Sequence, residues 1–210
     1  YFIGNHKLQS CSEVNDLGVQ IRSEMKVESH INKIVSKARI RSYLIKKCFR
    51  SRNTKTLVKA YQVYVRPLLE TNSSVWSPYL VKDINMVESV QRRFTKHLNG
   101  MSERSYAERL HALNLDSLEV RRIRADLIVA YKILFGQLNV DKELYFERNK
   151  YTATRSHVHK VTIPFAHSDI RKNFYTIRTA KIWNELPTEK VDFSCLKHFI
   201  STVSSLDFKQ

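Results

Sequence analysis

Apolar residues that recur at steps of three and four positions dominate the chain from about residue 27 onward, and this period constrains the fold more than any other feature. It predicts long helices over about 27–49, 57–65, 82–99 and 117–135, with shorter ones near 104–112, 170–184 and 192–205. Only four glycines and four prolines occur in 210 residues, which argues against a fold rich in tight turns. The sequence therefore predicts a mainly α protein built as a helical bundle.

The first 22 residues have a different character. Positions 1–3 and 8–21 have the pattern of extended strands, in part with alternating apolar and polar side chains. Gly4-Asn5, between the two stretches, is a sequence typical of a tight turn. We therefore expect a short N-terminal β-hairpin. A lone hairpin is marginally stable in water, and the chain begins with Tyr1 rather than methionine. Both features lead us to expect a fragment of a longer polypeptide with an upstream sheet.

The composition changes within 139–169, where the helical period is lost except for a possible short strand near 158–163. This predicts three parts: a β-hairpin over 1–22, a basic helical domain over 23–138, and a C-terminal extension over 139–210 that is irregular and then helical. No apolar run approaches the roughly 18 residues that span a bilayer, so no membrane partner is expected. Three cysteines, odd in number and far apart, favour a reducing intracellular compartment, nuclear or cytoplasmic.

Positive charge is concentrated in one part of the chain. The formal net charge is +16, and no acidic residue occurs between Glu28 and Glu70. That interval contains eleven cations: Lys33, Lys37, Arg39, Arg41, Lys46, Lys47, Arg50, Arg52, Lys55, Lys59 and Arg66. Solubility alone does not require that acids be absent from one segment. We therefore expect a polyanionic partner, with nucleic acid as the leading candidate.

Two groups of cations are the candidate contacts. The first lies on one ridge of the first predicted helix, at positions i, i+4 and i+8: Lys33, Lys37 and Arg41. The second lies off the apolar stripe of the predicted helix 82–99: Arg92, Arg93 and Lys96. All of them can reach a ligand at no cost to the core, and nucleic-acid phosphates are the expected targets. The alternative is an ordinary solvated helix face.

Aromatic and capping residues give further expectations. Tyr43, Tyr61 and Tyr64 are interleaved with the cations, and aromatic rings can stack on bases or sugars. Tyr61 and Tyr64 lie on an apolar stripe, so core packing is the favoured interpretation for both. Asp116 is expected to begin a capping box at the start of the helix 117–135.

Residues that would carry catalysis or bind a metal are missing or weakly patterned. The chain contains no Asp-Asp pair, so no two-Mg²⁺ site of the polymerase type is expected, and no GxxxxGK[ST], GxGxxG or GxSxG segment occurs. His157, His159 and His167 can in principle share a metal, but phosphate contact or plain surface positions are the favoured interpretations. No cofactor, metal ligand or catalytic residue is therefore predicted in this chain.

Several short blocks, in order, carry a resemblance to a known family. The first half contains Asp16-Leu17-Gly18-Val19, His30-Ile31, Val65-Arg66-Pro67-Leu68-Leu69-Glu70, Val75-Trp76-Ser77-Pro78 and Val87-Glu88-Ser89-Val90-Gln91-Arg92-Arg93-Phe94-Thr95-Lys96. The second half contains Tyr106-x-x-Arg109-Leu110, Leu118-Glu119-x-Arg121-Arg122, Asp126-Leu127-Ile128, Tyr131-Lys132-Ile133, Thr154-Arg155-Ser156-His157 and Trp183-Asn184-x-Leu186-Pro187. Over nearly its whole length the chain resembles the C-terminal part of reverse transcriptases (RNA-directed DNA polymerases) from LINE-type, non-LTR retrotransposons of the jockey and chicken-repeat kind.

The resemblance implies that residues 1–22 are the end of a palm, and that the following helices form a thumb and a C-terminal extension. In this family the thumb holds the template–primer duplex, so RNA and DNA, including the element's own RNA, are the implied partners. The six cations above and Arg155 are the implied contacts. The catalytic aspartates and their Mg²⁺ belong to the upstream palm and fingers of the same polypeptide. Thr71 and Ser156 depart from the pattern, where an aromatic residue and a glycine are usual.

The expected function is that of a non-catalytic C-terminal fragment that binds nucleic-acid backbone through basic helices. The alternative is a helical protein–protein interaction domain, repurposed or decayed, without enzymatic activity. The acid-free interval 29–69 argues against this alternative. Exposed apolar surface would favour it.

Overall fold

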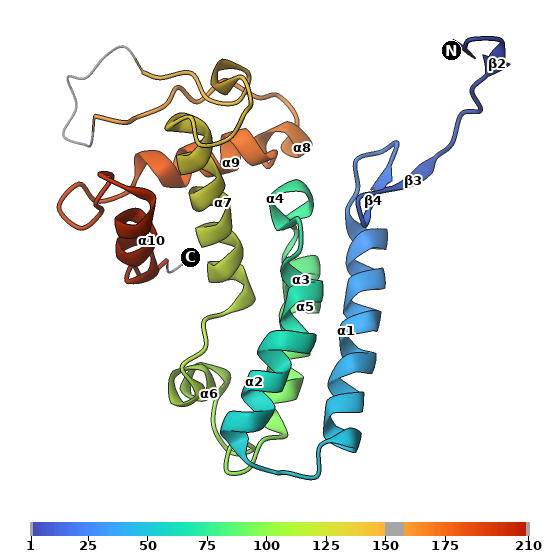
Figure 1. Ribbon diagram of the computed structural model, residues 1–210, viewed down its shortest axis with the longest axis vertical. Coiled ribbons are helices and arrows are strands. Elements are labelled where there is room, and N and C mark those ends of the chain that lie inside the picture. Colours follow the sequence, from blue (N-terminus) through green and yellow to red (C-terminus); the bar gives the residue numbers. More distant parts are fainter. Residues whose placement is uncertain (1, 150–157, 209–210) are drawn as a thin grey trace. The chain divides into compact units, whose positions relative to one another are not determined.

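The computed structural model describes residues 2–149 and 158–208 and is mainly helical (Figure 1). The longer helices are α1 (Glu28–Cys48), α2 (Thr54–Tyr64), α5 (Val81–Lys96), α6 (Tyr106–Leu113), α7 (Leu118–Leu134), α9 (Tyr175–Asn184) and α10 (Leu196–Ser204). The short helical segments are α3 (Arg66–Glu70), α4 (Ser73–Trp76), η1 (Lys142–Leu144) and α8 (Asp169–Lys172). The predicted mainly α class is confirmed. Within the described residues, no helix combines the length and the apolar composition needed to cross a bilayer.

Four short strands precede α1 and form two antiparallel pairs. β1 (Phe2–Ile3) pairs with β2 (His6–Lys7), and β3 (Glu13–Asp16) pairs with β4 (Val19–Arg22). The sequence predicts a single hairpin, but Leu17 and Gly18 supply a second tight turn. Both have positive φ, 46° and 85°, as the favoured two-residue hairpin turn requires.

The chain divides into two compact units, and each is described by itself. The first consists of residues 1–72 and 78–109, and the second of residues 73–77 and 110–210. The sequence predicts a boundary near 139 instead. The difference arises because α7 packs against α9 and α10, so its contacts group it with the C-terminal residues.

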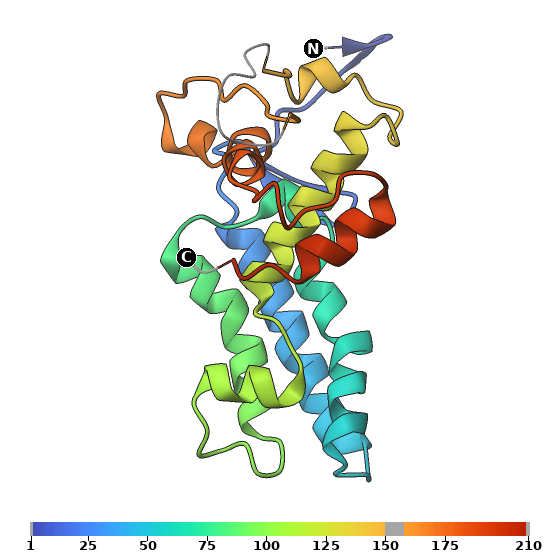
Figure 2. The same ribbon diagram turned by 90° about the vertical axis from the view of Figure 1, so that its left-hand side faces the viewer.

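In the first unit, α1 packs along α5 and also against α2 and α3, and Figure 2 shows α1, α2 and α5 running side by side. The predicted stripe of α1 is buried at Ile31, Val35 and Ala38. Tyr61 of α2 stacks on Phe94 of α5, with ring centroids 4.7 Å apart. This contact joins α2 to α5 through two fully buried rings.

The prediction that Tyr64 lies in the core is wrong, because its side chain is 53% exposed. α2 ends at this residue, and α3 begins with Arg66 and Pro67. The buried stripe continues past this residue through Val65 and Leu69, both 0% exposed, and Tyr64 lies beside the stripe rather than on it.

The second unit is built around α7, which packs against α4, α9 and α10. Trp183 and Phe199 are fully buried, with ring centroids 5.6 Å apart, and Tyr131 stacks on Phe199 at 4.6 Å. Trp76 of α4 is also buried, at 1% exposure. The first three of these aromatic rings pack in one core with aliphatic residues such as Leu127 and Leu134.

The start of α7 differs from the predicted capping box. Ser117 is the N-cap, and its hydroxyl accepts a hydrogen bond from the Val120 amide at 3.2 Å. Asp116 instead forms an ion pair with Arg124, Oδ2 to Nη1, at 2.6 Å. The serine takes the cap because it stands immediately before the first helical residue, where its side chain can reach that amide.

His30 joins the β3–β4 pair to α1. Its side chain is 3% exposed, and its Nδ1 accepts a hydrogen bond from the Gln20 amide of β4 at 3.2 Å. Burial lowers the pKa of His30, and the positive charges of Lys33 and Lys37 lower it further. The neutral imidazole is therefore the form that the folded protein favours.

Lowering the pH should destabilise the first unit through His30. Because its folded pKa lies below the usual 6.5, its contribution is complete above that value and is lost as the pH falls through the folded pKa. The slope for one proton is at most about 1.4 kcal/mol per pH unit. Urea unfolding at several pH values measures it. His30→Asn, which can accept the same bond without titrating, should show a shallower slope, and equal slopes would contradict this assignment.

Candidate nucleic-acid interface

The predicted cationic ridge of α1 lies on the flank that faces α2. Arg41 donates from Nη1 to the Tyr64 carbonyl oxygen at 3.2 Å, at the end of α2. Lys33 is half-buried and Lys37 is exposed on the two preceding turns of the same ridge. One of the three predicted contacts is thus partly engaged in holding two helices together.

The three cations predicted as contacts on α5 have different surroundings in the structure. Arg92, Arg93 and Lys96 are all exposed, as expected for residues off the apolar stripe. The Arg92 guanidinium lies 5.1 Å from the centroid of the Tyr106 ring. Arg93 instead lines a cavity formed with α1. These neighbours in sequence therefore serve different parts of the surface.

A cavity lined mainly by cationic and aromatic side chains lies between α1 and α5 and is hereafter called the α1–α5 cavity. Its volume is about 300 Å³. Four residues come from each helix: Arg39, Ser42, Tyr43 and Lys46 of α1, and Val90, Arg93, Phe94 and His97, the last being the C-cap of α5. The lining contains three strong cations and a histidine but no carboxylate. Such a lining suits an anion.

Local contacts hold the cationic side chains at the cavity. Arg39 donates from Nη2 to the Ser89 hydroxyl across the two helices, at 3.1 Å. The Lys46 ammonium lies 5.9 Å from the centroid of the Phe94 ring. His97 Nδ1 lies 2.6 Å from the Arg93 carbonyl oxygen, which can only accept, so Nδ1 carries the proton. Its Nε2 is then the atom left to meet a ligand.

The charges around the α1–α5 cavity are not neutralised by the protein. Within residues 2–149 and 158–208, Arg39, Lys46 and Arg93 form no ion pair. Elsewhere in the same unit cations do pair, as Lys82 does with Glu28 at 3.0 Å. Burial lowers the pKa of Lys46, and the nearby Arg93 guanidinium lowers it further. An anion in the cavity would remove this repulsion.

A buried polar chain fixes the position of Tyr106 and with it Arg92. The Tyr61 hydroxyl donates to Gln91 Oε1 at 3.1 Å, Gln91 Nε2 donates to the Tyr106 hydroxyl at 3.0 Å, and Tyr106 donates to Glu88. Burial raises the pKa of Tyr106, and the Glu88 carboxylate raises it further, so this phenol keeps its proton. The ring beneath Arg92 is therefore rigidly held.

The remaining predicted residues are distributed as follows. Lys96 is exposed on α5 and forms no contact with the α1–α5 cavity. Arg155 and His157 lie outside the described residues.

Sequence reasoning missed Arg39, Lys46 and His97 as candidate contacts. The available signal was the spacing of Arg39 and Lys46, seven residues apart on one side of α1, opposite to the chosen ridge.

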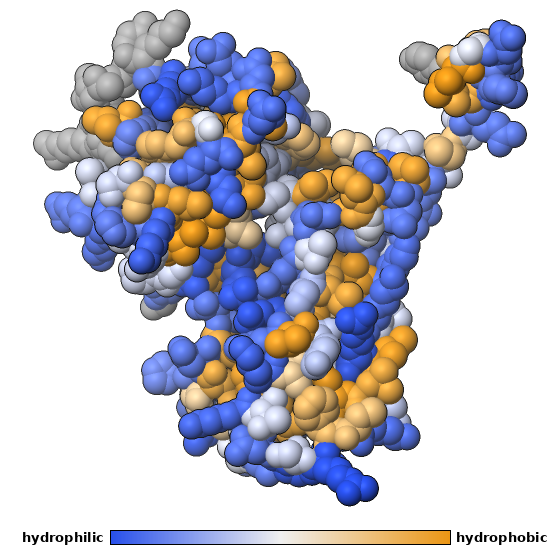
Figure 3. Space-filling model, viewed as in Figure 1, coloured by the Kyte–Doolittle hydropathy of each residue, from blue (hydrophilic) through white to orange (hydrophobic). Residues whose placement is uncertain are grey.

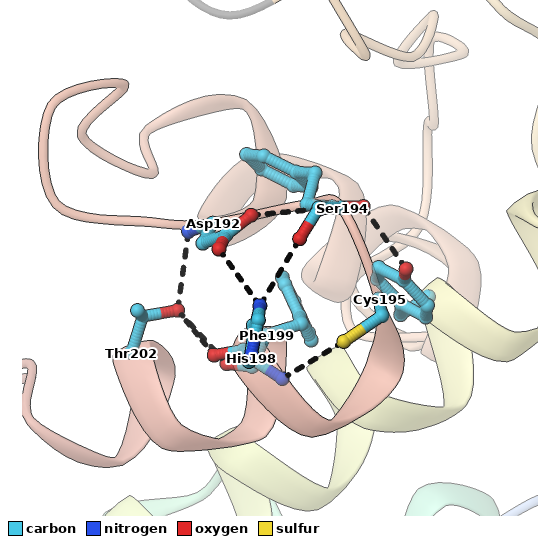
Figure 4. A network of polar contacts seen from close by, with 8 residues as sticks. Asp192, Ser194, Cys195, His198, Phe199 and Thr202 are labelled. Carbon is cyan, nitrogen blue, oxygen red and sulfur yellow. Dashed lines mark hydrogen bonds and ion pairs between the residues drawn. The ribbon is translucent and has the colours of Figure 1, made fainter.

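An aspartate and a serine of the loop before α10 lie beside a histidine of that helix, but their geometry is not that of a catalytic triad (Figure 4). Asp192 Oδ2 and Ser194 Oγ both approach Nδ1 of His198, each at 3.2 Å. A general base needs the serine on one ring nitrogen and the carboxylate on the other. Asp192 also accepts a hydrogen bond from the Ser194 amide at 2.8 Å, so the network orders the loop.

No group of three or more metal-ligating side chains occurs among the described residues.

An apolar groove of about 260 Å³ lies between α1 and α2. It is lined by Arg41, Leu44, Ile45, Cys48, Phe49 and Tyr64. Figure 3 shows apolar surface between these two helices, at the end of α1 that is farther from the strands. Leu44 and Tyr64 are about half exposed, at 48% and 53%. This groove is the feature of the unit that suits a protein partner rather than a polyanion.

Comparisons with known proteins place few constraints on the function. No family model matches the chain, and no solved structure matches it. The chain is 28% identical to an uncharacterized protein of Caenorhabditis elegans over 134 residues, which are 62% of this chain and 68% of that protein. The description of that protein states no activity.

Replacing Tyr106 by phenylalanine should destabilise the first unit by about 2 kcal/mol, because a hydrogen bond to a charged acceptor contributes roughly 1.5–3 kcal/mol. The ring beneath Arg92 would remain. Urea unfolding followed by tyrosine and tryptophan fluorescence measures the change. Tyr43→Phe, at a 55% exposed ring, is the control and should stay within about 0.5 kcal/mol of the parent. Equal stability of the two variants would show that the polar chain is dispensable.

Proposed function

We propose that this chain is a non-catalytic nucleic-acid-binding module that acts as the thumb of a LINE-type reverse transcriptase. Its first unit would hold the backbone of an RNA–DNA template–primer duplex, or the element's own RNA. The catalytic aspartates and their Mg²⁺ would come from palm and fingers elsewhere in the same polypeptide. Such a protein would work in the nucleus or the cytoplasm.

The observation that carries the proposal is the unneutralised charge of the α1–α5 cavity. Arg39, Lys46 and Arg93 converge from two helices without a carboxylate in the lining. A cluster of like charges opposes folding unless a counterion or a ligand neutralises it. Phosphates do so with release of condensed counterions, which gives binding that is strong at low salt and tolerant of sequence.

The ridge formed by Lys33, Lys37 and Arg41, and the outer residues of α5, would extend the interface beyond the cavity. Lys37 and Lys96 are exposed and can follow a backbone as mobile point charges. Arg92 is held over the Tyr106 ring and presents its guanidinium in a fixed place. The cavity would thus anchor the nucleic acid, and the outer cations would add nonspecific affinity.

A second candidate function is protein–protein interaction through the apolar groove between α1 and α2. The exposure of Leu44 and Tyr64 in that groove favours it. Such a groove accepts an apolar side chain of a partner helix or loop. Binding of this kind would depend weakly on salt, which separates it from the first proposal.

The proposed function predicts a steep salt dependence that is reduced by removing the charges of the cavity. Anisotropy of a labelled RNA–DNA hybrid would be measured with the parent chain and with Arg39, Lys46 and Arg93 all changed to alanine. The slope of log affinity against log salt should fall by about 0.9 for each phosphate that the variant no longer neutralises, on the scale of B-form DNA.

Two further triple variants remove the same charge from other places. Lys33, Lys37 and Lys96 changed to alanine should lower the slope less, because these residues are the proposed periphery. Lys181, Lys190 and Lys197, exposed in the second unit, should leave it nearly unchanged. If the second-unit variant weakened binding as much as the cavity variant, only net charge would matter. If the parent chain is folded but does not bind the RNA–DNA hybrid at low salt, the nucleic-acid proposal is wrong. Protein–protein interaction through the groove between α1 and α2 would then remain as the candidate function.

A further inference from the structure

The α1–α5 cavity contains more than a set of cations. Ser42 and Tyr43 line it beside the charged residues. The cavity therefore offers three kinds of contact within one small volume: cations for a phosphate, a hydroxyl for a further hydrogen bond, and an aromatic face. A plain electrostatic patch needs only the first of these.

The hydroxyl of Ser42 is buried and has no hydrogen-bond partner among the described residues. The whole residue is 8% exposed. A serine in a helix commonly satisfies its hydroxyl on the carbonyl one turn earlier, and Ser42 does not. Buried polar atoms without partners are rare in folded proteins and need an explanation. A ligand oxygen in the cavity would supply the missing partner.

Tyr43 provides the aromatic face. Its side chain is 55% exposed, so a flat ligand can reach the ring. The Lys47 ammonium lies 5.2 Å from the ring centroid and adds positive charge close to this face. Stacking on an aromatic ring tolerates any base, because every base has a π-face. The ring therefore suits the base of a nucleotide whose phosphate lies among the cations.

The size of the cavity selects an unpaired nucleotide over a duplex. Its volume of about 300 Å³ is at the lower end of the range for small-ligand sites. A base within a duplex is stacked and paired, so its π-face is not available to a protein ring. A nucleotide at a single-stranded end can leave the stack at little cost. Its phosphate can then enter between α1 and α5.

We infer that the α1–α5 cavity binds one unpaired nucleotide at the end of a nucleic-acid strand, with its phosphate among Arg39, Lys46 and Arg93, Ser42 as a hydrogen-bond donor, and its base on Tyr43. This inference rests on the proposed function, since the rest of the strand is held by the outer cations. It adds that the module distinguishes a strand end with unpaired nucleotides from the interior of a duplex.

The test compares two labelled RNA–DNA hybrids of equal paired length, one blunt and one with a short single-stranded overhang that carries a terminal phosphate. The parent chain should bind the overhang hybrid at least about fivefold more tightly, the low end of the effect of one stacked base. Tyr43→Ala should abolish this preference, because it removes the ring on which the overhanging base stacks. Tyr64→Ala, at another tyrosine of the unit with similar exposure, is the matched control and should keep the preference.

Ser42→Ala separates binding from folding. Removing a buried hydroxyl that has no partner should leave the thermal stability equal or higher, and the affinity for the overhang hybrid should fall by about tenfold or more, the size of one hydrogen bond to a charged group. Ser36→Ala, at an exposed serine of the same helix, should change neither quantity. A decrease in the stability of Ser42→Ala with an unchanged affinity for the overhang hybrid would assign the hydroxyl a structural role and overturn its place in the site.

The remaining outcomes are distinguishable. Equal affinity for the two hybrids, both bound with a steep salt dependence, overturns the inference and leaves the proposed function standing. Failure to bind either hybrid overturns both. Adenosine monophosphate is the free-nucleotide probe. If it bound the chain while the overhang gave no preference, the cavity would be a site for free nucleotides, and the strand-end inference would be wrong.

Discussion

The packing of α1 along α5 is the interaction on which the chemistry of the first unit depends. Val35, Ala38, Val90 and Phe94 are buried on the two helices. Burying each large apolar side chain contributes about 1.5–3 kcal/mol. Two unit charges near a protein surface repel each other by a few kcal/mol at about 4 Å, and by less when farther apart. Apolar burial along the two helices therefore exceeds the repulsion among the cations that this packing brings together.

Most of the fold could be predicted from the sequence, because the helices are long and strongly periodic. The stripe of α5 through Val90 and Phe94 is buried, as expected for the apolar stripe of a helix over 82–99, and Gly100 just after the helix has a positive φ of 72°. Predictions that depended on a single boundary were weaker. Ser117 caps α7 although Asp116 precedes it, and Leu17 adopts positive φ although it has a side chain. Local sequence patterns do not determine which of two neighbouring residues caps a helix or adopts positive φ.

The candidate site could be predicted only in part, for a different physical reason. Periodicity shows which cations share a ridge, and it correctly kept Arg92, Arg93 and Lys96 off the buried stripe. It does not show which flank of α1 faces α5, since that is decided by tertiary packing. The cavity pairs Arg93 with Arg39 and Lys46, which are more than forty positions away in the sequence. No spacing rule within one helix reveals a site shared by two.

If the α1–α5 cavity anchors the nucleic acid, Lys46 lies at the contact and reports on it directly. Acetylation of lysines in the intact chain, read by mass spectrometry with and without an RNA–DNA hybrid, would measure its accessibility. The hybrid should protect Lys46 more strongly than Lys33 or Lys37 and leave Lys181 reactive. Unchanged reactivity of Lys46, with protection of Lys33 and Lys37, would place the contact on the outer ridge and rule out the cavity as the anchor.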